Sequence, residues 1–209
     1  HSDLHKDLVE HGPVESGRLR AAGVKIYADG ALGSRGARLL APYQDDRRSP
    51  GLWITEPPAI EREVEAAFAA RLQPAVHAIG DAANRAVLDA FDKAVAARPE
   101  GAALRPRIEH AQVVAPADIP RFARDGMIAS MQPTHATSDM PWAEERLGPE
   151  RLTGAYAWKS LLTAGARLAL GSDFPVESPD PLRGLYAAVT RQDAQGRPPG
   201  GWLPGERLT

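Results

Sequence analysis

The chain has 209 residues, of which 43% are hydrophobic and 25% are charged, and its formal net charge is -2. This is the composition of an ordinary globular protein with one large domain or two small ones, and no run of basic residues indicates a nucleic-acid partner. The chain has no cysteine, which excludes disulfides and thiolate metal ligands, so any metal would be held by His, carboxylate or modified Lys.

The hydropathy pattern argues against a membrane protein. No apolar stretch approaches the roughly 18 residues that a membrane span requires, and the first residues lack the apolar core of a signal peptide. We therefore expect a soluble protein in the cytoplasm, with no membrane partner.

A short apolar run that leads into polar residues and a loop recurs along the chain. These runs predict five strands, at residues 23–27, 74–79, 107–111, 127–131 and 167–170. Segments with helical periodicity or helix-start signals lie between them and predict helices at residues 60–72, 84–97, 117–124 and 154–163. We expect the Pro- and Gly-rich segment 193–209 to be a loop.

This alternation of strands and helices argues for βαβ units and a parallel sheet. Five units fit either a doubly wound sheet or part of a barrel, and periodicity alone does not distinguish the two. No linker, internal repeat or low-complexity tract divides the chain.

Four ionisable residues lie at or just beyond the carboxyl ends of the predicted strands, namely Lys25, His77, His110 and Asp173. That edge is where α/β proteins build their sites. The 33 positions from His77 to His110 correspond to one βα unit, and the 63 from His110 to Asp173 correspond to two. Two imidazoles and a carboxylate on one rim suit zinc or a similar divalent ion.

Lys25 adds a particular possibility. Its neighbours Val24 and Ile26 are apolar, and from them we expect the Lys25 amine to be buried. Burial favours the neutral amine, which can capture carbon dioxide to form a carbamate whose two oxygens can bridge two metal ions. The alternative is a lysine that points into solvent, which is common at strand ends.

Four segments resemble the YtcJ-like branch of the amidohydrolase superfamily, which includes N-substituted formamide deformylases: VKIYADGALGSRGA, AVHAIGDAANRAVLDAF, RIEHAQ and LALGSDFPV. The resemblance covers about residues 23–202, and the four motifs occur in the family's order and spacing. It implies that Lys25, His77, His110 and Asp173 are the metal ligands of barrel strands four, five, six and eight.

The resemblance implies that residues 1–209 form strands four to eight of a TIM (β/α)8 barrel, incomplete at both ends. The family's first three strands, its small β domain and the H-x-H pair of its first strand have no counterpart here. His1 and His5 lie four positions apart, which suits a helix face rather than a strand. An open half-barrel would expose two strand edges, so we expect a homo-oligomer or association with the missing part of the barrel.

The implied reaction is metal-dependent hydrolysis of a C–N bond in a small amide or formamide, with one or two divalent ions, zinc first among them. Metal-activated hydroxide would attack the carbonyl, and Asp173 would act as general base. Two other hypotheses stay open. The first is an inactive fragment that only binds metal or assembles. The second is a phosphate-binding doubly wound domain, which the polar, proline-punctuated stretch after Gly36 disfavours.

Four further residues could contact the substrate. Asp29 and Arg35 lie in a glycine-rich loop that could approach the site. His135 follows the fourth predicted strand and could orient the substrate carbonyl, although a structural loop histidine fits equally well, and Trp142 could line the pocket. Asp81 precedes a helical segment, where an N-cap is the simpler role.

Overall fold

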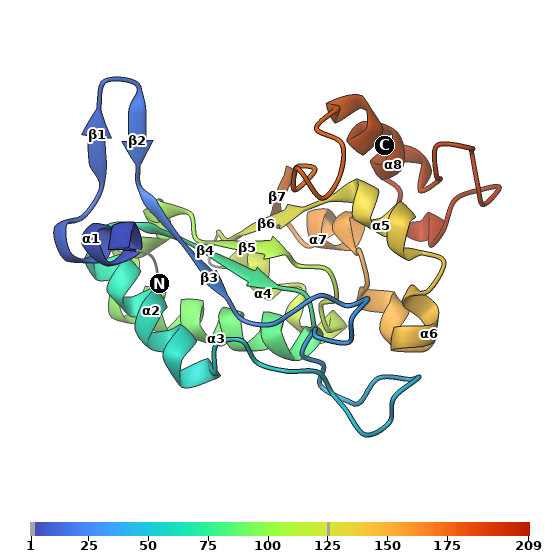
Figure 1. Ribbon diagram of the computed structural model, residues 1–209, viewed down its shortest axis with the longest axis horizontal. Helices are drawn as coiled ribbons and strands as arrows, with labels where there is room; N and C mark the ends of the chain where they lie inside the picture. Colours follow the sequence, from blue (N-terminus) through green and yellow to red (C-terminus); the bar gives the residue numbers. More distant parts are fainter. Residues whose placement is uncertain (1–2, 125) are drawn as a thin grey trace.

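The structure, a computed structural model, describes residues 3–124 and 126–209. Its main feature is a parallel five-stranded sheet in which the strands are hydrogen-bonded in chain order (Figure 1). The strands are β3 (Gly23–Tyr27), β4 (Gln73–Ala78), β5 (Arg107–His110), β6 (Ile128–Met131) and β7 (Arg167–Leu170). Each lies within one residue of its predicted bounds. His1 lies outside the described residues.

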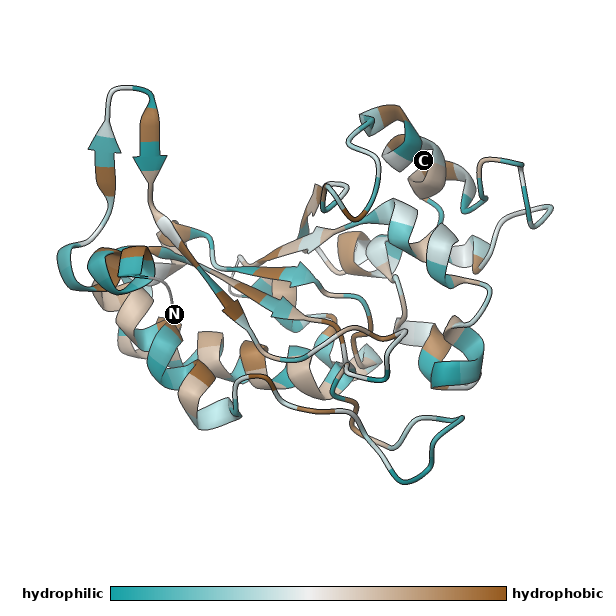
Figure 2. Cartoon of the chain, viewed as in Figure 1, coloured by the Kyte–Doolittle hydropathy of each residue, from teal (hydrophilic) through white to brown (hydrophobic). Residues whose placement is uncertain are grey.

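The remaining elements are helices and a small hairpin. The helices are α1 (Asp3–His11), α2 (Pro57–Ala69), α3 (Asp81–Ala97), η1 (Pro99–Leu104), η2 (Pro116–Asp118), α4 (Arg121–Arg124), α5 (Pro133–Asp139), α6 (Ala143–Leu147), η3 (Arg151–Gly154), α7 (Trp158–Thr163), α8 (Pro181–Thr190) and η4 (Pro204–Glu206). The antiparallel hairpin of β1 (Val14–Ser16) and β2 (Leu19–Ala21) carries both hydrophilic and hydrophobic residues and projects from the sheet (Figures 1 and 2). Among the described residues, no helix is long and apolar enough to cross a bilayer.

Two predicted helices are divided in the structure. The segment 117–124 forms η2 and then α4, because Pro120 has no N–H group and so cannot donate a helical hydrogen bond there. The segment 154–163 begins as η3 and continues as α7 only after Tyr156, whose φ of 51° cannot belong to a right-handed helix. The prediction of one continuous helix was wrong at both places.

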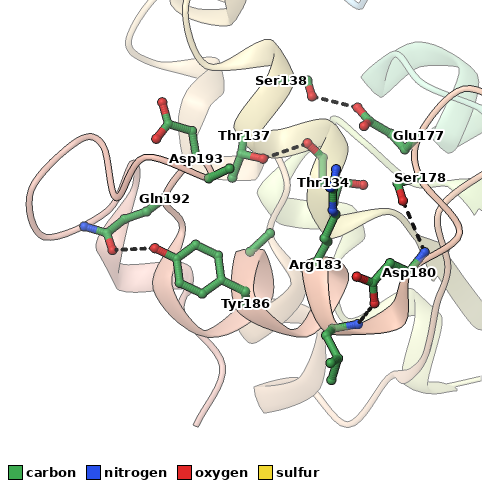
Figure 3. Close-up of a pocket in the computed structure, with 13 residues that line it drawn as sticks. Thr134, Thr137, Ser138, Glu177, Ser178, Asp180, Arg183, Tyr186, Gln192 and Asp193 are labelled. Carbon is green, nitrogen blue, oxygen red and sulfur yellow. Dashed lines mark hydrogen bonds between the residues drawn. The ribbon is translucent and has the colours of Figure 1, made fainter.

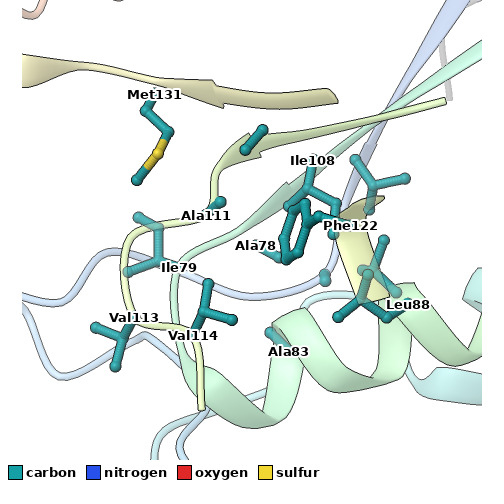
Figure 4. Packing of buried hydrophobic residues seen from close by; sticks show 14 of the residues in the cluster. Ala78, Ile79, Ala83, Leu88, Ile108, Ala111, Val113, Val114, Phe122 and Met131 are labelled. Carbon is teal, nitrogen blue, oxygen red and sulfur yellow. The ribbon is translucent and has the colours of Figure 1, made fainter. Parts of the chain in front are cut away.

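The strand order decides between the two predicted architectures. A doubly wound sheet reverses its strand order near the middle, whereas here each new strand adds to the same side of the sheet. Apolar strand residues such as Ile26, Val76 and Ile108 join one core with the helices. Leu88 of α3 and Phe122 of α4 lie beside Ile108 in that core (Figure 4). Parallel strands that follow one another in order, with their helices packed on one face of the sheet, form part of a barrel.

The opposite face of the sheet is concave in a barrel, and it carries the polar residues. Lys25 pairs in register with Ala75, and Tyr27 pairs with His77. Because side chains alternate along a strand, Val24 and Ile26 pack toward the helices while Lys25 faces the other way. The expectation that Lys25 is buried was therefore wrong, since its residue as a whole is exposed.

Both outer strands of the sheet have an open edge among the described residues. The strand β7 is intermediate or exposed along its whole length. The neighbouring helix α8 also exposes large apolar side chains, with Leu182 at 70% and Leu185 at 56% of their full accessibility. These surfaces fit the expectation that a half-barrel has uncovered edges.

The segment 193–209, expected to be a loop, packs against the core through Trp202 and Leu208. Arg191 holds this segment against the core. Its Nε donates to the Trp202 carbonyl at 2.8 Å, and its Nη1 donates to the Tyr156 carbonyl at 2.8 Å. The guanidinium lies 4.1 Å from the Trp158 ring centroid and 5.5 Å from that of Trp202. Burial lowers the pKa of Arg191 to about 10, so it stays charged at neutral pH.

We expect Arg191→Leu to lower the free energy of unfolding by about 3 kcal/mol, since it removes two charge-assisted hydrogen bonds and a desolvated cation–π contact. Arg197→Leu is the matched control. Its side chain is 69% exposed and forms an exposed ion pair with Asp193 and a long hydrogen bond to Gln195, so its loss should cost less than about 0.5 kcal/mol. Urea unfolding followed by tryptophan fluorescence measures both, and equal effects would show that Arg191 does not secure this segment.

Candidate metal and substrate site

His77 is the fifth of six residues in β4 and presents its ring at the carboxyl end of the sheet. Its Nε2 lies 3.5 Å from Asp29 Oδ1, yet it is buried and makes no hydrogen bond with any described residue. Burial is the largest cause that lowers the pKa of His77 to about 3, followed by the charges of His110 and Lys25. The ring is therefore neutral and keeps a lone pair for a ligand.

Asp29 holds this part of the backbone in place. The side chain is 0% exposed, and its carboxyl oxygens accept hydrogen bonds from the backbone N–H groups of Ile79 at 2.9 Å, Gly80 at 2.8 Å and Arg38 at 2.7 Å. Burial raises the pKa of Asp29 to about 7, and the three N–H groups oppose that rise. A Cβ at Gly80 would lie 2.0 Å from the Arg38 carbonyl oxygen, so the close approach requires glycine.

His110 is the last residue of β5 and has a φ of 74°, which is unusual for a residue with a side chain. Its ring lies edge-on to that of His77, with 4.6 Å between the ring centroids. Its Nδ1 lies 2.8 Å from Gln132 Oε1, and Gln132 Nε2 donates to the Ser130 carbonyl at 3.2 Å. That second bond orients the amide, so Nδ1 of His110 is the donor and Nε2 carries the lone pair.

Lys25 and Asp173 lie on the same rim at different depths. Lys25 is two residues short of the end of β3, which places it about 7 Å deeper than a residue at the end of the strand. Desolvation lowers the pKa of its amine, while the charges of Glu109 and Asp173 raise it. Asp173 follows β7 by three residues, has a φ of 55° and is exposed.

The four residues line one cavity of about 450 Å³ at the carboxyl end of the strands. Its other lining residues are Tyr27, Ala31, Leu32, Gly33, Ile79, Gln112, His135, Asp139, Trp142, Val176 and Glu177. His135 and Trp142, both predicted from the sequence as substrate contacts, therefore border the predicted ligands. A Cβ at Gly33 would meet the Trp142 ring at 3.2 Å, which explains how the glycine-rich loop fits closely beneath it.

Asp29 and Arg35 are not in the lining of this cavity. The Asp29 carboxyl is fully buried against backbone N–H groups, and Arg35 forms a bidentate pair with Asp45, with distances of 3.1 and 2.8 Å. The structure thus engages both groups elsewhere, and their expected role as substrate contacts gains no support. Asp81 is the first residue of α3 rather than its N-cap, and its Oδ1 accepts from the Leu40 N–H at 2.8 Å.

Polar residues that the sequence did not single out also border the site, among them Gln112, Gln132 and Asp139. Gln112 and Asp139 line the cavity, and Gln132 holds His110. Gln112 follows β5 by two residues and Gln132 directly follows β6, so the signal that found the histidines, a polar residue just past a strand, could have found both. Asp139 ends α5 and carries no such signal.

A second cavity, of about 560 Å³, lies between α5 and α8 (Figure 3). It contains none of the four predicted ligands, and its lining includes Thr134, Arg183 and Tyr186. Glu177 lines both cavities, and Ser138 Oγ donates to Glu177 Oε1 at 2.6 Å (Figure 3). This contact forms the wall between them.

The donor types fit a divalent metal ion, since two neutral imidazoles, a carboxylate and a lysine with a lowered pKa face one cavity. The unpartnered, buried Nε2 of His77 also fits a site for a ligand atom. Within residues 3–124 and 126–209, however, no three His, Asp or Glu side chains gather closely enough to hold a metal. The arrangement supplies two adjacent imidazoles, and Asp173 lies on an exposed loop.

Asp29→Ala should lower the free energy of unfolding by about 3 kcal/mol or more, because it leaves three backbone N–H groups without an acceptor in a buried place. Asp180→Ala is the control, since the exposed Asp180 side chain caps α8 by accepting from the Leu182 N–H, and its loss should cost about 1 kcal/mol. Denaturant titration compares the two. Equal losses would contradict the structural role of Asp29.

Comparison with known proteins identifies the family of this chain. The model of the amidohydrolase family matches residues 1–209. The putative amidohydrolase YtcJ of Bacillus subtilis (strain 168) is 41% identical over 171 residues, which are 82% of this chain and 32% of that protein. The protein LONG AFTER FAR-RED 3 of Arabidopsis thaliana is 38% identical over 202 residues, 96% of this chain and 34% of that protein. The chain thus spans about a third of these curated relatives.

Two solved structures have the same fold over most of the chain. An uncharacterized metal-dependent hydrolase from Pyrococcus furiosus has a TM-score of 0.84 and 34% identity, covering 99% of this chain and 41% of that one. Another, from Pyrococcus horikoshii OT3, has a TM-score of 0.80 and 35% identity, covering 90% and 38%. Sequence and structure agree, and the chain belongs to the amidohydrolase family.

Proposed function

We propose that residues 1–209 form part of the catalytic barrel of a metal-dependent hydrolase that cleaves C–N bonds in small amide-type substrates, including formamides. One or two divalent ions, with zinc as the first candidate, would be held by four residues: Lys25, His77, His110 and Asp173. Lys25 would act as a ligand in its carbamate form. The observation that carries this proposal is the pair of neutral imidazoles from adjacent strands, 4.6 Å apart, at one cavity with Lys25 and Asp173.

The residues of this chain would divide the work as follows. When bound, a divalent ion lowers the pKa of a water molecule and polarises a carbonyl oxygen. A carboxylate oxygen of Asp173 would accept a proton from the attacking water and return it to the departing nitrogen, as the C–O bond forms and the C–N bond breaks. His135 would orient the carbonyl, and Trp142 would cover the cavity beside it.

The second candidate is a module that binds metal or assembles without catalysis. Two observations favour it, namely that no three His, Asp or Glu side chains gather in the described part of the chain, and that β7 leaves an open edge. Both observations are compatible with catalysis only if further donors or contacts complete the site.

His77→Gln and His110→Gln should each weaken zinc binding at least about tenfold, because each removes an imidazole donor. His11→Gln on the exposed side of α1 is the control and should bind zinc as the wild type does. The protein is produced from its complete coding sequence, loaded with zinc and dialysed, and its zinc content and circular dichroism are measured. Unchanged zinc in both folded variants would contradict the proposed ligands.

The two candidate functions separate in an activity assay on the zinc-loaded protein. Formate release from N-benzylformamide, and amine release from a panel of small amides, should fall at least about a thousandfold in Asp173→Asn if this group moves the proton. A protein that retains zinc and hydrolyses none of these compounds would favour the assembly module.

A further inference from the structure

One wall of the cavity that holds the predicted ligands is a small polar network. Tyr156 OH donates to Asp139 Oδ2 at 2.6 Å, and Gln112 Nε2 lies 3.0 Å from the same oxygen and 2.7 Å from Tyr156 OH. Tyr156 is 2% exposed and Gln112 is 5% exposed. The network therefore joins the loop after β5, the end of α5 and the segment just before α7.

The two oxygens of Asp139 differ in their surroundings. Both hydrogen bonds of the side chain end on Oδ2, whereas Oδ1 has no hydrogen-bond partner among the described residues, and Asp139 is half-buried. Asp139 lines the cavity with His110, His135 and Trp142. The carboxyl is thus anchored by one oxygen and offers the other to whatever occupies the cavity.

The neighbouring groups make this oxygen an acceptor for an N–H group. Burial raises the pKa of the Asp139 carboxyl above its ordinary value, whereas the Tyr156 hydrogen bond and the charge of His135, one helical turn earlier on α5, oppose that rise. The nearby Trp142, Leu32 and Val176 provide apolar surface in the same cavity. A carboxylate beside an apolar wall suits a ligand that has N–H donors next to an apolar substituent.

We propose that Asp139 is a specificity-determining residue whose Oδ1 accepts a hydrogen bond from the nitrogen of the substrate, selecting secondary amides and the primary ammonium product with an apolar substituent. This inference rests on the proposed hydrolytic function and assigns the side of the cavity that receives the leaving group. Tyr156 and Gln112 are positioning residues, because they act on Oδ2 and hold the carboxyl in one orientation.

The polar network of Tyr156, Gln112 and Asp139 is also connected to the carboxyl-terminal part of the chain. Arg191 NH1 donates to the Tyr156 carbonyl at 2.8 Å, at the residue whose φ is 51°. The strained backbone turns the Tyr156 side chain inward, toward Asp139. Such support from a buried shell is what keeps a recognition group in a single rotamer.

The test measures binding rather than turnover, so that it is independent of catalysis. Zinc is removed with a chelator from the protein produced from its complete coding sequence, and calorimetry compares benzylammonium, which has N–H donors, with benzyltrimethylammonium, which has none. We expect the wild type to prefer benzylammonium and Asp139→Asn to weaken that binding about tenfold or more, with a smaller loss for benzyltrimethylammonium, which shares the charge but not the N–H donors.

Tyr156→Phe should weaken benzylammonium binding about threefold, since the Gln112 bond to Oδ2 remains. Asp89→Asn makes the same chemical change on the outer helix α3 and should leave both dissociation constants unchanged. The proposal is overturned if the wild type shows no preference for benzylammonium, or if folded Asp139→Asn, checked by its unfolding temperature, binds it as the wild type does. Loss of hydrolysis with this preference intact would instead contradict the proposed function alone.

Discussion

The site depends first on the buried carboxyl of Asp29. By accepting hydrogen bonds from the N–H groups of Ile79 and Gly80, it fixes the turn that follows β4, and its third bond, from the Arg38 N–H, ties the glycine-rich loop to the same point. Asn84 acts from the other side, where its Nδ2 lies within hydrogen-bond distance of carbonyls on both sides of the β4–α3 turn and of the Val113 carbonyl. Buried polar groups that are satisfied in this way hold one arrangement strongly. The side of the cavity that carries His77 is therefore held by hydrogen bonds between side chains and the backbone as well as by apolar packing.

Much of the fold could be predicted from the sequence because buried parallel strands appear as short apolar runs that end in polar residues. The same local pattern led to the wrong prediction that Lys25 is buried. Its apolar neighbours do pack on the helices, and alternation along the strand turns Lys25 to the opposite face. Helix bounds failed where a single residue overrode periodicity, as Tyr156 does with its positive φ. The hairpin of β1 and β2 is too short and too exposed to leave an apolar pattern.

For the site, too, the sequence predicts which residues lie near one another but not what their side chains contact. Residues that follow strands at one sheet edge must lie near one another, so His77 and His110 could be paired from their positions alone. What their rings contact could not be predicted. The bond from His110 to Gln132 spans 22 positions, and the network of Gln112, Asp139 and Tyr156 spans up to 44. Asp29 was expected to touch the substrate, because a sequence motif does not show which acidic residue of a loop turns inward.

The two sides of the cavity differ in how firmly they are held, and this difference bears on activity. His77 and His110 stand on inner strands, where Asp29 fixes the turn after β4 and Gln132 holds the His110 ring. Asp173, in contrast, is exposed, follows the outer strand β7 and lies beside the exposed apolar side chains of Phe174 and Val176. Catalytic groups act only when the surrounding structure holds them in the productive geometry. A contact that covers the β7 edge would bury Phe174 and Val176 and restrict Asp173 at the same time. If Asp173 has the role proposed for it, covering that edge would therefore also order the loop that carries the proposed proton-transfer group.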